Sequence, residues 1–65
     1  MNDPIKTIRI HQQLTKYLAE HDLVLMMGRV FDKDGNFLVM VDWSKVDVNR
    51  PFDINDFPEV LPFLK

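Results

Sequence analysis

Two almost continuously apolar runs, joined by a short polar turn, constrain the fold of this chain more than any other feature. Residues 23–31 and residues 37–43 both have strand-forming composition, and the segment 32–36 between them has the residues of a tight turn. A hairpin with one face in water alternates apolar and polar residues, and this one does not. The sequence therefore predicts a β-hairpin over residues 23–43 that needs cover on both faces.

The turn at 32–36 allows two registers for the hairpin. In a two-residue type I′ turn Phe31 faces Leu38, whereas in a three-residue loop with Gly35 at a bulge Phe31 faces Phe37. Only the first register leaves one sheet face free of charged residues, and a one-residue slip moves every side chain to the other face. We therefore prefer the type I′ register. The predicted core face then consists of Val24, Met26, Gly28, Val30, Phe37, Val39, Val41 and Trp43.

The N-terminal segment 4–21 has the pattern of one helix. Asp3 and Pro4 form a good start, because an acidic residue can cap a helix and proline fits its first turn. The alternating β-branched run 5–10 also fits a short strand, with a helix beginning near Gln12. We favour the long helix because no capping residue stands just before Gln12. Its predicted core stripe consists of Ile10, Leu14, Tyr17, Leu18 and His21.

Residues 44–65 form an acidic, aromatic-rich tail that cannot form a long regular element, because it holds three of the four prolines. The run 56–59 has the pattern of a single capped helical turn. An extended segment of this composition suits docking into a basic, apolar-lined groove of another protein. Alternatively, the tail folds back over the second face of the hairpin. The predicted partner-binding residues are Trp43, Phe52, Asp53, Asp56, Phe57, Phe63 and Leu64.

A chain of 65 residues is small for a stable core, since it buries only about 60% of its unfolded surface. The absence of cysteine excludes disulfides and thiolate metal sites, so we expect self-association or a partner to supply stability. No apolar run is long enough to span a membrane, and the N-terminus lacks a signal-peptide pattern. We expect a cytoplasmic protein.

No motif in the sequence carries catalytic or metal chemistry. The turn at 32–36 begins like a calcium-binding EF-hand loop, but Phe37 and Trp43 stand where that loop needs glycine and glutamate. His11 and His21 lie about 15 Å apart along a helix and cannot share a metal. We therefore expect no enzymatic activity, no cofactor and no metal.

These features predict a small α+β domain over residues 1–65, with a helix packed on a hairpin and an irregular tail. We interpret it as a non-enzymatic interaction protein that binds and inhibits or regulates a larger protein, as a homodimer. The alternative is a nucleic-acid-binding regulator of the ribbon-helix-helix type, using Lys6, Arg9 and Lys16 on phosphates. The net charge of −2 disfavours that alternative.

Overall fold

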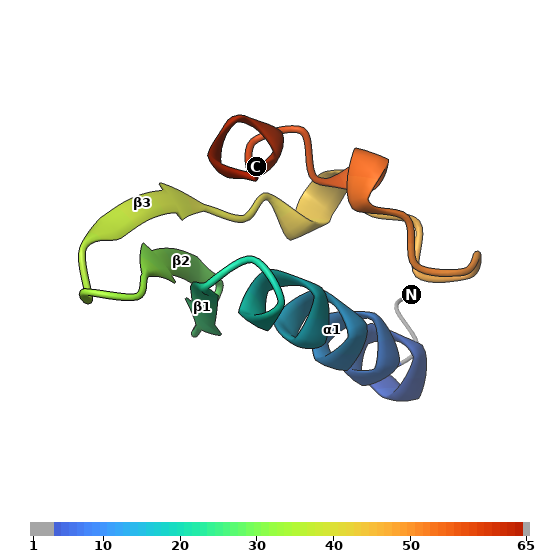
Figure 1. Ribbon diagram of the computed structural model, residues 1–65. Coiled ribbons are helices and arrows are strands. Elements are labelled where there is room, and N and C mark those ends of the chain that lie inside the picture. Colours follow the sequence, from blue (N-terminus) through green and yellow to red (C-terminus); the bar gives the residue numbers. More distant parts are fainter. Residues whose placement is uncertain (1–3, 65) are drawn as a thin grey trace.

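The computed structural model describes residues 4–64, and it has one helix, a three-stranded antiparallel sheet and a C-terminal segment of short 3-10 turns (Figure 1). The expected α+β class is confirmed. The helix is α1 (Pro4–Ala19), and the strands are β1 (Leu23–Met26), β2 (Arg29–Asp32) and β3 (Phe37–Met40). Single 3-10 turns follow at Trp43–Lys45, Ile54–Asp56 and Leu61–Phe63. In Figure 1 the C-terminal segment runs back on the side of the molecule opposite α1.

Helix α1 is continuous, so the alternative strand over residues 5–10 is wrong. The helix ends two residues before its predicted end, and Asp22, with a φ of 62°, turns the chain into β1 through a left-handed backbone conformation. The predicted cap, Asp3, lies outside the described residues. The buried side chains of α1 follow the predicted stripe at helical spacing. They are Ile10, Leu14 and Leu18.

The predicted single hairpin over residues 23–43 is instead a meander of two hairpins, with strand order β1-β2-β3. The chain reverses at Met27 and Gly28, whose φ values of 52° and 77° have the sign that a two-residue type I′ turn requires. Met26 and Arg29 pair beside this turn. The sequence did not indicate it, because a left-handed backbone favours Asn, Asp or Gly over methionine.

The second turn combines the two registers that the sequence allowed. Beside the turn Phe31 pairs with Phe37, so the preferred type I′ pairing is wrong there. Gly35, with a φ of 88°, takes the left-handed position that the three-residue loop requires. Farther from the turn Arg29 pairs with Met40, as the preferred register predicted, because a β-bulge in between absorbs the shift.

The two turns decide which side chains face inward. Because side chains alternate along a strand, pairing of Leu25 with Val30 places both on the inner face. Three residues predicted for the core are instead exposed: Val24, Met26 and Phe37. The prediction failed for Val24 and Met26 because it treated β1 and β2 as one continuous strand, and for Phe37 because the β-bulge shifts the pairing of β3 by one residue beside the second turn.

The core lies between α1, the inner face of the sheet and the C-terminal segment. Its buried residues are Ile10, Leu14, Leu18, Leu23, Leu25, Val30, Val41, Phe57 and Val60. Phe57 and Val60 are fully buried, so the tail folds back onto the body of the protein. The backbone amide of Asp42 donates a hydrogen bond of 2.7 Å to the carboxylate of Glu59, which joins the exit of β3 to the tail.

The chain turns where the sequence predicted a single turn, at 56–59, because the amide of Val60 donates a hydrogen bond of 2.9 Å to the carbonyl of Phe57. The predicted cap, Asp56, is paired with Arg50 instead. A 3-10 turn at Ile54–Asp56 leads into this turn, and a second one occupies Leu61–Phe63. The first 3-10 turn is capped by Asp53, whose side chain accepts a hydrogen bond of 2.9 Å from the Asn55 amide. The tail packs against the inner side of the sheet and leaves its outer face open.

Candidate functional site

The outer face of the sheet is the first surface that bears on function. Residues paired across an antiparallel sheet share a face. The pairings therefore define the outer sheet face as Val24, Met26, Arg29, Phe31, Phe37 and Met40. Met26, Phe37 and Met40 are 56%, 55% and 56% exposed. No described part of the chain covers these apolar side chains, and Arg29 is the one charged residue among the six.

The outer sheet face is not flat, because it has both projecting rings and a cavity. Phe31 and Phe37 pack edge to face, with ring centroids 6.0 Å apart. Beside them a cavity of about 320 Å³ opens on the sheet, with Val24, Met26 and Phe31 in its wall. The sheet therefore presents both projecting apolar side chains and a hollow that could receive one.

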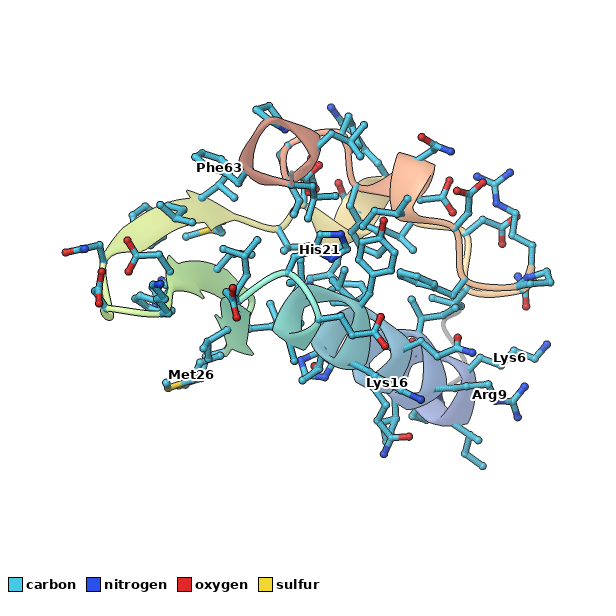
Figure 2. The ribbon with its side chains drawn as sticks, in the orientation of Figure 1. Lys6, Arg9, Lys16, His21, Met26 and Phe63 are labelled. Atoms are coloured by element: carbon cyan, nitrogen blue, oxygen red, sulfur yellow. The ribbon has the colours of Figure 1, made fainter. Side chains whose placement is uncertain are left out.

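Met27 extends this apolar surface at the tip of the first hairpin. It is 85% exposed, the highest value among the large apolar side chains of residues 4–64. Its φ of 52° is left-handed, which costs a residue with a Cβ atom roughly 1 kcal/mol. A strained backbone that displays an apolar side chain to water is typical of a residue kept for binding. Figure 2 shows the neighbouring Met26 projecting from β1 into solvent.

The second surface is a groove along α1. Lys6, Arg9, Gln13 and Lys16 share one side of the helix, because they follow one another at intervals of three or four residues. Figure 2 shows the side chains of Arg9 and Lys16 extending from α1, and both residues are exposed. Two adjoining cavities of about 320 and 330 Å³ separate this side of α1 from residues 48–52. Gln13 lines both, so the two cavities lie next to each other along α1, and together they are called the groove below.

The far wall of this groove is held in place by polar contacts. Lys6 Nζ donates a hydrogen bond of 3.1 Å to Asn49 Oδ1, which ties the helix to the opposite wall. Arg50 forms an ion pair with Asp56. The hydrogen bond to the Asp56 carboxylate, followed by its negative charge, raises the pKa of the Arg50 guanidinium above its usual value. Arg50 therefore keeps its charge and its position.

The structure brings the predicted aromatic residues of the tail together, but as packing groups. Phe57 is fully buried. Its ring centroid lies 5.5 Å from that of Trp43 and 6.0 Å from that of Phe52. Trp43 also stacks on His11, and Phe52 contacts Tyr17. Phe57 is thus withdrawn from solvent, and Trp43 and Phe52 are partly buried.

The other predicted partner-binding residues also have structural contacts. Asp53 caps a 3-10 turn, Asp56 is paired with Arg50, and Phe63 and Leu64 pack partly buried against the core. Their role in partner binding stays a prediction. The outer sheet face was not among the predicted partner-binding residues, because its composition depends on the turn at Met27 and on the β-bulge.

Another cavity, of about 490 Å³, lies between the end of α1 and the second hairpin, and its wall carries Glu20, Asp22, Asp32 and Asp34. The amide of Asn36 donates to the Asp32 carboxylate and holds the pKa of Asp32 below its usual 3.8. Among residues 4–64, no group of three or more histidine or acidic side chains is placed to hold a metal ion.

Comparisons with known protein families, with curated proteins and with solved structures find no match for this chain. Within the described part of the chain, no helix is long and apolar enough to cross a membrane.

Proposed function

We propose that this chain is a non-enzymatic interaction protein that forms a homodimer through its outer sheet face and binds and regulates a larger protein. The observation that supports this most is the exposed apolar surface of that face. Its exposed side chains, together with Met27, offer roughly 500 to 600 Å² of apolar surface, at about 200 Å² for a fully exposed Phe or Met side chain. A stable interface needs about 800 Å² from each partner, so this surface can form its centre.

A second copy of the chain fits the outer sheet face by its own chemistry. The side chains of the outer sheet face form two rows across the strands, one through Arg29 and one through Phe31. If a two-fold axis lies between the two sheets and perpendicular to the strands, the Arg29 row of each copy faces the Phe31 row of the other copy. Arg29 then lies over the ring of Phe31 in the second copy, a favourable cation–π contact. Met27, at the tip, reaches towards the cavity beside Phe31 of the second copy. The same contacts repeat on both sides of the axis.

A larger protein partner and a cytoplasmic location also belong to this proposal. A cytoplasmic location is supported by the absence of cysteine, since small secreted domains usually depend on disulfides. The ribbon-helix-helix alternative requires a strand at residues 6–11 that enters the DNA groove, but these residues lie within α1. Its basic residues Lys6, Arg9 and Lys16 instead lie along one side of α1.

Sedimentation equilibrium across a concentration series tests the homodimer. Phe37→Lys places a charge on the outer sheet face, and Ile8→Lys places one on α1 at the same 55% exposure. We expect the wild type and Ile8→Lys to approach twice the monomer mass of 7.7 kDa, and Phe37→Lys to remain monomeric with an unchanged circular dichroism spectrum. A monomeric wild type, or an equal effect of both variants, would contradict the proposed interface.

Site-specific photocrosslinking in the source cell tests the larger partner. A photoreactive phenylalanine analogue replaces Phe37 in one variant and Ile8 in the matched control. We expect a product heavier than two chains from position 37 and none from position 8. A product of two chains only from position 37 would mean that the face serves self-association alone, which contradicts the regulatory part of the proposal.

A further inference from the structure

We infer that the groove between α1 and residues 48–52, here called the basic groove, binds an acidic peptide segment of the larger partner. This inference rests on the proposed function, because it names the chemistry by which that partner is recognised. The residues that matter most are Lys6, Arg9, Gln13, Lys16, Arg50 and Phe52.

The spacing of the cations along the groove fits an extended peptide. Lys6, Arg9 and Lys16 span about 15 Å of helix at a rise of 1.5 Å per residue. In an extended peptide every second side chain points the same way, about 6.6 Å apart, so three such carboxylates span about 13 Å. The two lengths agree closely enough for one peptide to place a carboxylate near each cation.

The donors in the groove suit carboxylates. Arg9 presents a planar guanidinium that can hold a carboxylate with two parallel hydrogen bonds. Gln13, between the two cavities, offers an amide that can donate to the peptide backbone or to a second carboxylate. On the opposite wall Asp56 fixes the Arg50 guanidinium, so that little conformational freedom is lost when a ligand binds.

The far end of the groove suits an apolar anchor. Phe52 and Tyr17 have ring centroids 5.8 Å apart, and both line the second cavity beside Lys16. A partner residue such as leucine or phenylalanine can rest against these rings. The groove therefore selects a peptide in which acidic residues precede an apolar one.

The same surroundings disfavour nucleic acid. Asp47, Asp53 and Asp56 all act on the charge of Arg50 and raise the pKa of its guanidinium. A phosphate backbone carries a charge at every nucleotide and would meet these carboxylates, whereas a peptide can place neutral residues opposite them. Glu20, at the wall of the second cavity, adds another negative charge at that end.

Fluorescence anisotropy with a labelled peptide of alternating glutamate and alanine, ending in phenylalanine, tests the inference. We expect Arg9→Gln to weaken binding about tenfold, since it removes a charge-assisted hydrogen bond. The matched control Lys45→Gln removes a cation whose side chain is 79% exposed and lines neither cavity, and it should leave binding unchanged. A peptide with glutamine in place of glutamate should not bind.

Three results would overturn the inference: no binding of the acidic peptide, equal binding of the glutamine peptide, or equal loss in Lys45→Gln and Arg9→Gln. A uridine oligonucleotide serves as the competing ligand. If the oligonucleotide binds more tightly than the peptide, and its affinity falls steeply with salt, the groove is a nucleic-acid site instead.

Sedimentation of Arg9→Gln distinguishes failure of the groove proposal from failure of the dimer proposal. Failure of peptide binding with the dimer intact overturns only the groove, and a monomeric wild type that binds the peptide overturns only the sheet interface.

Discussion

Replacing two phenylalanines tests how the structure divides the chain into core and surface. Phe57 comes from the tail and is fully buried, whereas Phe37 comes from the strand-rich half and is 55% exposed. The sequence predicted Phe37 for the core, and Phe57 for partner binding or, if the tail folds back, for cover of the hairpin. Replacement of each by alanine, in separate variants, therefore measures the same chemical change in two environments.

The magnitudes follow from burial. Removing the Phe57 ring takes roughly 100 to 150 Å² of apolar surface out of the core, about 2.5 to 4 kcal/mol at about 25 cal/mol per Å². The cavity left behind raises the loss in unfolding free energy to about 3 to 5 kcal/mol. The Phe37 ring is already half in water, so its removal should cost about 1 kcal/mol. A domain of this size has about 3 to 10 kcal/mol in total, so Phe57→Ala approaches the limit of folding.

Urea unfolding, followed by circular dichroism and by Trp43 fluorescence, measures these losses. Trp43 contacts Phe57 and so reports directly on the core. With a slope of about 1 kcal/mol per molar urea, the urea midpoint should fall by about 3 M or more for Phe57→Ala and by about 1 M for Phe37→Ala.

If Phe57→Ala does not fold, Phe57→Leu replaces it in the test, with an expected loss in unfolding free energy of about 1 kcal/mol. Measurements at several protein concentrations separate dimer dissociation from unfolding. Equal midpoints for the two alanine variants would refute the packing of the tail described above.

Three further predictions follow from the turns. Met27→Asn should raise the unfolding free energy by about 1 kcal/mol, because asparagine tolerates the left-handed backbone, while weakening self-association in sedimentation; no gain in the urea midpoint would mean that Met27 is unstrained. Gly35→Ala should cost about 1 kcal/mol from its φ of 88° alone, since an added Cβ meets nothing within 4 Å, and a neutral effect would contradict that backbone conformation. Asp32 has its pKa lowered in the folded state, mainly by hydrogen bonds from Asn36, so its contribution to stability is present above the ordinary pKa of 3.8 and is lost as the pH falls below it. Thermal unfolding of Asp32→Asn should depend less on pH across that range than unfolding of the wild type, and parallel curves would count against the prediction.

Periodicity in the sequence was sufficient to predict the helix and the fold class. The spacing of Ile10, Leu14 and Leu18 is that of a helix with one buried stripe, and that stripe is what the core contains. The tail posed a different difficulty, because its composition fits both a docking segment and a folded-back cover. Only the three-dimensional arrangement, with Phe57 against Trp43, distinguishes these two.

The sheet could not be predicted in detail, because its turns depend on a backbone conformation that composition does not reveal. The reversal at Met27 lacks the asparagine or aspartate that usually marks a type I′ turn at this position. The bulge between Val30 and Phe31 then shifts the register partway along a strand, so neither simple register could be right throughout. Both errors moved whole rows of side chains from one face to the other.

The turn at Met27 and the β-bulge, which the sequence prediction did not include, are the features that create the proposed interface. A single regular hairpin would have placed Val24, Met26 and Phe37 under α1, whereas the turn at Met27 directs Val24 and Met26 outward and the β-bulge does the same for Phe37. Asparagine at position 27 would make the turn at a lower energy, yet the chain displays an exposed methionine there. Methionine is a flexible apolar side chain that adapts to irregular binding surfaces. A strained backbone, an adaptable side chain and an uncovered apolar face thus coincide at one end of the sheet, and a binding partner accounts for all three, whereas stability of the monomer accounts for none of them.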